Sequence, residues 1–176
     1  MSKTYVIIGV FLFIILALGA APFFLKHKSS VSDTASRASV SLPNTTLKSA
    51  DGNDVNLSDF RGKPLVINLW ASWCPFCKDE LLNLAYLQRE YGEKITVIAI
   101  NRGESPGQIQ KMRQELGIGT SSVMLLDSDD TLYQTLGGFA MPEILFVNKD
   151  GMIRQHQRGL ISREELRRRV QDLVQR

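Results

Sequence analysis

Residues 64–92, "PLVINLWASWCPFCKDELLNLAYLQREYG", contain the pattern from which the fold of this chain can be predicted. It opens with a nearly continuous apolar run up to Trp70, which is typical of a strand buried on both faces. Apolar residues then recur near helical spacing until Gly92, which ends the pattern. The sequence therefore predicts a strand followed directly by a helix. Cys74 and Cys77, the two cysteines of the chain, lie at the junction between them.

The following segment continues the alternation of strands and helices. Residues 95–101 are again apolar and predict a second buried strand, which completes a β-α-β unit. Ser105 is expected to cap the next helix, with Pro106 in its first turn and Gln108 as the capping-box partner. A further strand and a short helix are expected at 123–127 and 131–136.

Turn dipeptides predict two antiparallel hairpins. Asp51-Gly52 lies between 45–49 and 54–57, and Asp150-Gly151 lies within 143–159. Ser162 and Glu165 are expected to form a capping box at the start of an amphipathic last helix. This order of elements predicts an α/β fold with a mixed central sheet flanked by helices, preceded by an N-terminal β-hairpin.

The N-terminal segment Thr4–Leu25 carries no charged residue over 22 positions. As a helix it would span about 33 Å, which is enough to cross a bilayer. A cleaved signal peptide is the alternative, because the small residues at 19–21 could form a processing site. The apolar run continues past Pro22, so we favour a retained transmembrane helix, with residues 1–25 as the membrane anchor.

Residues 26–40 contain five serines and no apolar period, which is typical of a flexible linker. The folded domain is accordingly expected over residues 41–176. Lys3, Lys26 and Lys28 account for the whole formal charge of +3, so the rest of the chain is balanced and is not predicted to bind nucleic acid. Because these lysines flank the apolar segment on both sides, charge does not decide which side of the membrane the domain occupies.

The sequence argues against a purely structural role and against a metal-binding role for the cysteine pair. Two cysteines are sparse for a secreted disulfide scaffold, and a domain of this length can build a core without cross-links. The spacing of Cys74 and Cys77 is half of a tetrahedral zinc site, but His27 lies in the linker. His156 lies on a strand face that is expected to be exposed to solvent. We predict no metal and no cofactor beyond the cysteine pair itself.

Redox chemistry fits the position of the pair better. At a helix start, Cys74 would lie near unpaired backbone N–H groups and the positive end of the helix dipole, which both favour the thiolate. Cys77, one turn later and more covered, suits a resolving thiol that attacks a mixed disulfide. Pro75 fits the first helical turn. Two packed cysteines without chemistry are the plain alternative, and their place at a helix start argues against it.

The segment "GKPLVINLWASWCPFCKDE" resembles the thioredoxin-like proteins of the membrane-anchored TlpA/ResA/DsbE group. The resemblance covers residues 42–175 and includes "LSDFRGKP", the Trp-Cys-x-x-Cys motif and "GGFAMPEILFVNKDG", which matches the cis-proline segment of that family. It implies a thioredoxin fold on the extracytoplasmic side that exchanges disulfides with client proteins. It also implies a cis Met141-Pro142 bond that faces the cysteines and presents the Met141 backbone to a client peptide.

Further site residues follow from the same resemblance. Asn68 occupies the position of the buried proton-accepting aspartate of thioredoxin, so another base is needed. Glu80, one turn beyond Cys77, matches a glutamate used in this family, and its pKa should rise if it is partly buried beside the thiols. The alternative is that Glu80 belongs to the charged surface at the helix start. Glu143 follows Pro142 as it does in cytochrome c maturation members, and it is a candidate for client contact.

The aromatic residues beside the thiol are candidates for client docking. Trp73 and Phe76, together with Pro75 between the cysteines, would form a contact surface of low conformational entropy. Phe76 is uncommon in the family at its position, and Leu82 stands where relatives often have a proline. The arginine-rich C-terminal segment is interpreted as the solvated face of the last helix.

We therefore predict a membrane-tethered thiol:disulfide oxidoreductase in which Cys74 attacks, Cys77 resolves and Glu80 manages the resolving proton. The resemblance implies that it reduces clients such as apocytochrome c and is kept reduced by a membrane electron donor. Three alternatives stay open: an oxidising or isomerising exchange protein, a Cu(I)-binding module, and a peroxidase on a related fold. The peroxidase resemblance would require a threonine where Ala71 stands.

Overall fold

The computed structural model of the chain describes residues 40–175. The anchor predicted at 1–25 and all but the last residue of the linker predicted at 26–40 lie outside the described residues. Within residues 40–175, no helix is long and apolar enough to cross a membrane. Val40, the first described residue, already lies in a strand.

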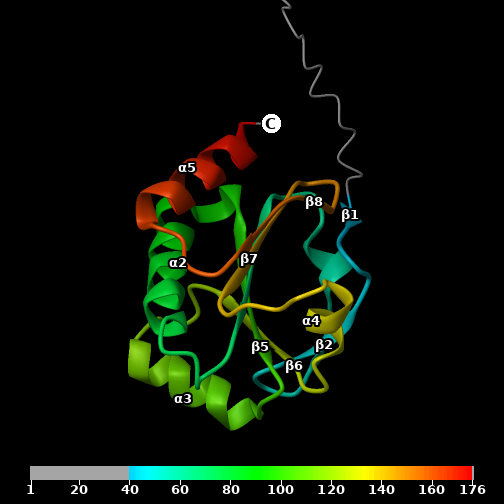
Figure 1. The fold of residues 1–176 in the computed structure, drawn as a ribbon, viewed down its shortest axis with the longest axis vertical. Helices are drawn as coiled ribbons and strands as arrows, with labels where there is room; N and C mark the ends of the chain where they lie inside the picture. The colour runs from blue at the N-terminus through cyan, green and yellow to red at the C-terminus, as the bar shows by residue number, and fades with distance from the viewer. Residues whose placement is uncertain (1–39, 176) are drawn as a thin grey trace, which may run out of the picture. The chain divides into compact units, whose positions relative to one another are not determined.

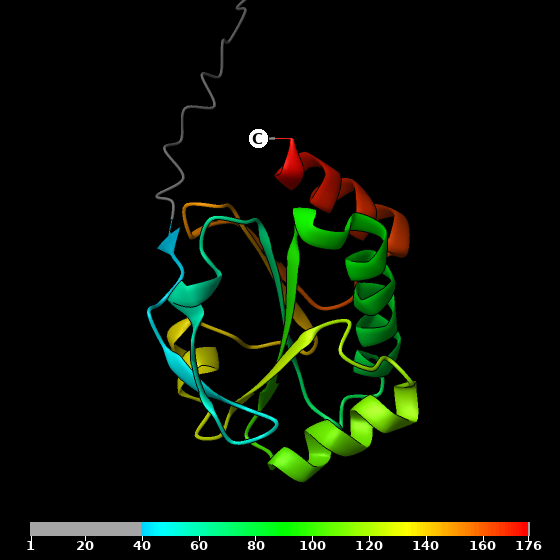
Figure 2. The same ribbon diagram turned by 180° about the vertical axis from the view of Figure 1, so that it is seen from behind.

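One mixed sheet forms the centre of the described part of the chain (Figures 1 and 2). Its strands are β1 (Val40–Ser41), β2 (Thr46–Ser49), β3 (Asp54–Asn56), β4 (Leu65–Trp70), β5 (Thr96–Arg102), β6 (Val123–Asp127), β7 (Glu143–Val147) and β8 (Met152–Arg158). Their order across the sheet is β1-β8-β7-β4-β5-β6-β2-β3. The β4–β5 and β5–β6 pairs are parallel, and all the others are antiparallel.

Helices cover both faces of the sheet. They are α2 (Cys77–Tyr91), α3 (Pro106–Leu116), α4 (Thr131–Thr135) and α5 (Arg163–Val174), with short 3-10 helices η1 (Leu57–Phe60) and η2 (Gly92–Lys94). Figures 1 and 2 show α2, α3 and α5 on one side and α4 on the other. Because side chains alternate along a strand, the fully buried strand β4 contributes to both layers.

The two layers divide the apolar residues of β4 between them. Val66 packs with residues of α2 and α5, and Trp70 packs with residues of α2 and α3. Leu65, Ile67 and Leu69 pack on the other side with Leu132 of α4, and with residues of β2 and η1. The alternation explains why the sequence of β4 is apolar at nearly every position.

The predicted mixed α/β fold and both hairpins are confirmed. β2 and β3 pair around the Asp51-Gly52 turn, and β7 and β8 pair around Asp150-Gly151 with a register shift between Phe146 and Val147. At the last helix, the Ser162 hydroxyl accepts the Glu165 N–H at 3.1 Å, as expected of an N-cap. The Glu165 carboxylate instead pairs with Arg168 and Arg169, so only half of the capping box forms.

Two local predictions are wrong. Ser105 is the N-cap residue of α3 and Pro106 lies in its first turn, as predicted, but the Ser105 side chain makes no capping hydrogen bond. The Gln108 side chain donates to the Ser72 hydroxyl at 3.3 Å, so the predicted capping box does not form. Helix α2 begins at Cys77, with Phe76 as its N-cap, so Pro75 lies before the helix rather than in its first turn. Cys74 therefore lies in a turn between β4 and α2. At the start of α3, the contact between Gln108 and Ser72 takes the place of the expected capping box.

Candidate active site

The cysteine pair lies where β4 ends and α2 begins. Cys74 and Cys77 form a disulfide, and their Cα atoms lie 5.4 Å apart. Both are buried, with 2% of Cys74 and 0% of Cys77 exposed. The Cys77 N–H donates to the Cys74 carbonyl at 3.3 Å, which closes the turn between them. The pair thus sits at the N-terminus of α2, where the helix dipole favours negative charge on a reduced Cys74.

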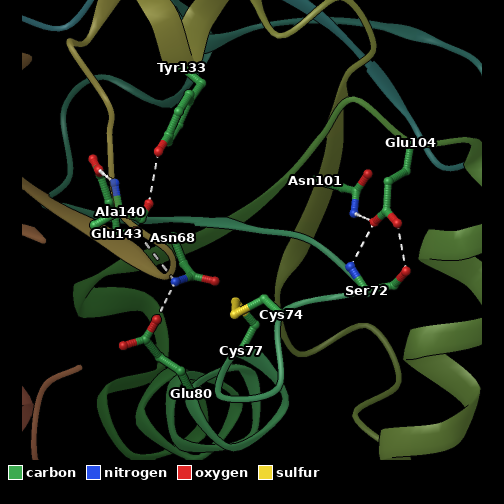
Figure 3. Close-up of a disulfide and its surroundings, with 10 residues drawn as sticks. All are labelled: Asn68, Ser72, Cys74, Cys77, Glu80, Asn101, Glu104, Tyr133, Ala140 and Glu143. Atoms are coloured by element: carbon green, nitrogen blue, oxygen red, sulfur yellow. Dashed lines mark hydrogen bonds between the residues drawn. A yellow bond between two sulfur atoms is a disulfide. The ribbon is translucent and has the colours of Figure 1, made fainter. Parts of the chain in front are cut away.

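A carboxylate from the neighbouring strand end holds the turn that carries Trp73 and Cys74. Glu104 accepts the Ser72 N–H at 2.7 Å, the Ser72 hydroxyl at 2.5 Å and the Asn101 amide at 2.6 Å (Figure 3). Trp70 and Asn101 are register partners in the parallel β4–β5 pair, so the polar residues that follow both strands meet at one edge. Sequence reasoning missed Glu104, although this meeting of parallel strand ends was the available signal.

Glu80 and Asn68 lie together in the interior, beside the disulfide (Figure 3). Only 4% of Glu80 is exposed, and the Asn68 side-chain amide donates to its Oε2 at 2.6 Å. Burial raises the pKa of Glu80 from 4.5 to about 7, although the hydrogen bond from Asn68 lowers it. The raised pKa expected from the sequence is confirmed. Glu80 therefore titrates near neutrality, as a proton acceptor for a thiol would need to do.

Two atoms of this buried pair lack partners. Neither the Oε1 atom of Glu80 nor the Oδ1 atom of Asn68 has a hydrogen bond within residues 40–175. A protonated carboxyl has one O–H to donate and an ionised one has none, so this arrangement gains little from ionisation. The unpaired oxygens agree with a carboxyl that holds its proton near neutral pH.

The predicted cis bond between Met141 and Pro142 is confirmed. It lies in the segment that connects α4 to β7. The Pro142 carbonyl accepts the Gly159 N–H at 2.8 Å. Within the described residues, the Met141 backbone N–H and C=O have no hydrogen-bond partner. They are free to pair with an extended peptide, as the resemblance implies.

Three aromatic side chains of the site segments are exposed. Trp73 is 64% exposed and Phe76 is 52% exposed, in agreement with the predicted contact surface. Phe139, just before the cis bond, is 78% exposed and was not singled out from the sequence. Trp70, which was expected in the core, is fully buried. Exposed aromatic side chains are typical of contact surfaces for other proteins.

Glu143, the candidate for client contact, is fully buried at the start of β7. Its Oε1 atom accepts the backbone N–H groups of Phe139 and Ala140, both at 2.8 Å. Its Oε2 atom lies 2.5 Å from Nε2 of His156. The carboxylate contacts the chain's own cis-proline segment, and client contact by Glu143 stays a prediction.

His156 was expected on a solvent-exposed face, and this expectation is wrong. Its side chain is 15% exposed. His156 lies in β8 directly opposite Leu145 of β7, and residues opposite each other on neighbouring strands share a face of the sheet. The Glu143 carboxylate lies against the His156 ring and covers this face of β8. Exposure along β8 does not alternate as expected, because a register shift interrupts its pairing with β7 between Phe146 and Val147. Within residues 40–175, no group of three or more His, Cys, Asp or Glu could hold a metal ion.

Comparison with known proteins places this geometry in a family. The model of the AhpC/TSA family matches residues 39–156. The chain belongs to the AhpC/TSA family. A relative named thiol-disulfide oxidoreductase ResA, from Geobacillus thermodenitrificans, is 22% identical over 161 residues, which are 91% of each chain. ResA from Bacillus subtilis is 25% identical over 154 residues, which are 86% of this chain and 82% of the relative.

Solved structures of other proteins share the fold. A DsbE-type thiol:disulfide interchange protein from Chlorobium tepidum superimposes with a TM-score of 0.71 at 21% identity, over 77% of this chain and 96% of that chain. DsbF of MTB has a TM-score of 0.68 at 26% identity, over 74% and 95%. The resemblance to the TlpA/ResA/DsbE group is confirmed. The fold, the Cys-Pro-Phe-Cys disulfide and these relatives agree on a thiol:disulfide oxidoreductase, the enzyme class predicted from the sequence.

Proposed function

We propose that this protein is a membrane-tethered, extracytoplasmic reductant of protein disulfides. The observation that carries the proposal is a buried Glu80 with a pKa of about 7, on the same helix as Cys77 and beside the disulfide. A group that titrates near neutrality can both take and return the proton of a resolving thiol. The names of the ResA relatives and the match to their length support the class of reaction.

The reaction begins with the reduced pair. The Cys74 thiolate attacks one sulfur of a client disulfide, forming a mixed disulfide and releasing the other client sulfur as a thiolate that takes up a proton. Cys77 then loses its proton to Glu80 and attacks the sulfur of Cys74. This step forms the Cys74–Cys77 disulfide and releases the second client thiol. The second client sulfur leaves as a thiolate and takes the proton that Glu80 received from Cys77. The client gains two electrons from the pair and two protons, one of them from Cys77 by way of Glu80 and the other from solvent, because Cys74 entered the reaction as a thiolate.

The surroundings of the two cysteines favour Cys74 as the attacking thiol and Cys77 as the resolving thiol. Cys74 precedes α2 and receives the favourable field of its N-terminus, so it suits the attacking role. Cys77 lies within the first turn of α2 and is fully buried, so a client sulfur reaches it only through Cys74. Trp73, Phe76 and the Met141 backbone would hold the client while the two exchanges occur.

The direction, client and location rest on the resemblance and on the N-terminal sequence. The uncharged segment Thr4–Leu25 supports a membrane tether. The Pro142-Glu143 pair supports apocytochrome c, with its own cysteine pair, as the client. A membrane donor of the disulfide-reductase type would return the disulfide to the dithiol after each cycle.

A peroxidase is the second candidate, because the matching family model carries the AhpC/TSA name. Ala71, three residues before Cys74, is fully buried and has no hydroxyl to offer a peroxide. Turnover of hydrogen peroxide by the reduced protein, at a rate similar to disulfide exchange, would favour the peroxidase over our proposal.

The deciding experiment measures the redox equilibrium of the Cys74–Cys77 pair against glutathione, together with reduction of a cysteine-pair peptide from an apocytochrome. We expect a reducing potential and a Cys77→Ser variant that accumulates a mixed disulfide at Cys74. Cys74→Ser is the matched control and should form no such adduct. A strongly oxidising potential would overturn the direction of the reaction, and equal adducts in both variants would overturn the roles of the two sulfurs.

A further inference from the structure

A fully buried carboxylate ties the cis-proline segment to the outer part of the sheet. Glu143 opens β7, and both of its oxygens are engaged on the face of the sheet away from α2. Leu69 is its register partner in β4 and packs in the layer that contains α4. The carboxylate thus lies on the opposite face from Glu80, and its contacts are separate from those of the disulfide.

The segment before the cis bond is held through its backbone. Ala140 donates its N–H to Glu143 at 2.8 Å and accepts the Tyr133 hydroxyl on its carbonyl at 2.9 Å (Figure 3). Phe139 donates its N–H to the same carboxylate oxygen. Gly138 lies against the Tyr133 ring, where an added Cβ would come within 2.4 Å of a ring carbon. The route of the chain into Met141 is therefore set by Glu143 and Tyr133.

His156 supplies a contact to the second oxygen of Glu143. Its Nε2 atom lies 2.5 Å from Oε2, whereas Nε of the Arg158 guanidinium lies 4.0 Å from Oε1. The Arg158 guanidinium also stacks over the Phe139 ring, 5.1 Å from its centre. Without His156, Oε2 would be a buried oxygen without a donor, and a buried carboxylate in that state moves or takes up a proton.

We propose that His156 is a positioning residue for client binding, acting through Glu143 on the cis-proline segment. It orients the carboxylate, the carboxylate holds the Phe139 and Ala140 N–H groups, and these place the Met141 backbone where an extended client peptide can pair with it. The inference rests on the disulfide-exchange function proposed above. It concerns protein clients, because a small disulfide needs no strand-like pairing to reach Cys74.

The test compares a protein client with a small disulfide in full-length protein. His156→Leu removes the ring N–H, and we expect kcat/KM for insulin reduction to fall about tenfold, mainly through KM. The rate with glutathione disulfide and the redox potential should stay within about twofold, because the sulfurs and Glu80 are untouched. His156→Gln should restore most of the lost activity, because its amide N–H can replace that of the ring Nε2. Arg154→Leu, on the same strand, is the matched control.

A second measurement covers the case in which His156→Leu does not fold. His156→Asn keeps a polar side chain that is too short to reach Glu143, and hydrogen exchange at Phe139 and Ala140 should accelerate at least tenfold in it relative to His156→Gln. Unchanged exchange, or an equal loss on insulin and glutathione disulfide, would overturn the positioning role. A wild-type protein that reduces neither substrate would overturn the proposed function instead, while amide exchange still decides the role of His156.

Discussion

The side-chain amide of Asn68 lies 2.6 Å from the carboxylate of Glu80, and both residues are buried beside the disulfide. A hydrogen bond from an amide is too weak to offset the cost of burying a carboxylate, so the pKa of Glu80 stays raised at about 7. One strand and one helix thus place a group that titrates near neutrality next to two sulfurs that must exchange protons.

Replacement of Glu80 by glutamine should slow the resolving step. The variant keeps the shape and the neutral form of the side chain, but it cannot take the Cys77 proton. Single-turnover oxidation of the reduced protein at pH 7 should slow at least tenfold, and the inflection near pH 7 should disappear from its pH profile. Asn68→Leu is the companion variant, because loss of its hydrogen bond should move that inflection to higher pH. A wild-type inflection that survives in Glu80→Gln would remove Glu80 from the mechanism.

The stability of the oxidised protein should fall as pH rises from about 4.5 to about 7. Across this window folded Glu80 retains a proton that the unfolded chain has already lost, because its pKa is raised on folding. The contribution is fully present below the window and lost above it, with a total on the order of 3 kcal/mol. Urea unfolding at several pH values should show this slope in the wild type and a flatter one in Glu80→Gln.

Asp127 is a second source of pH-dependent stability, which must be separated from that of Glu80. Burial raises its pKa too, so it adds a pH dependence of the same sign that Glu80→Gln leaves in place. The difference between the two proteins, rather than the wild-type slope, is therefore the quantity to compare. A difference that does not change between pH 4.5 and 7 would contradict the raised pKa of Glu80.

Glu104→Ala should loosen the turn that carries Cys74. The substitution leaves the Ser72 N–H, the Ser72 hydroxyl and the Asn101 amide without their acceptor. We expect a loss of about 3 kcal/mol in the free energy of unfolding. Alkylation of the reduced Cys74 should also show a changed thiol pKa. Glu115→Ala is the matched control, because Glu115 pairs with Lys78 at the surface, where solvent screens the ion pair, and its removal should leave the free energy of unfolding nearly unchanged.

The exposed aromatic residues beside the disulfide should contribute to binding of protein clients. Replacing both Trp73 and Phe76 by serine should raise KM for a protein disulfide about tenfold and leave turnover of glutathione disulfide within twofold. Tyr86→Ser is the control, because Tyr86 is a similarly exposed aromatic residue farther along α2. An equal rise in KM for the Tyr86 variant would contradict the prediction, because the loss of any exposed aromatic ring would then weaken client binding.

The order of strands and helices could be predicted because it depends on local patterns. The apolar run of β4, the spacing of Leu81 and Leu84 in α2 and the turn at Asp51-Gly52 each act within a few residues. The cis bond before Pro142 was predictable only through the family resemblance, since a prolyl bond by itself is rarely cis.

Local patterns in the sequence were enough to predict the order of elements, the fold class and the place of both cysteines at the junction of β4 and α2, because hydrophobic period and turn signals are properties of single elements. Packing between elements was needed to bury Glu80 beside Asn68, to place Glu104 on the cysteine turn, and to bring Glu143 and His156 onto the cis-proline segment. The same packing places the side chain of Gln108, the predicted capping-box partner of Ser105, against the Ser72 hydroxyl. These polar contacts join residues on different strands and helices, and a buried polar group is satisfied by whichever partner the packed chain brings within reach.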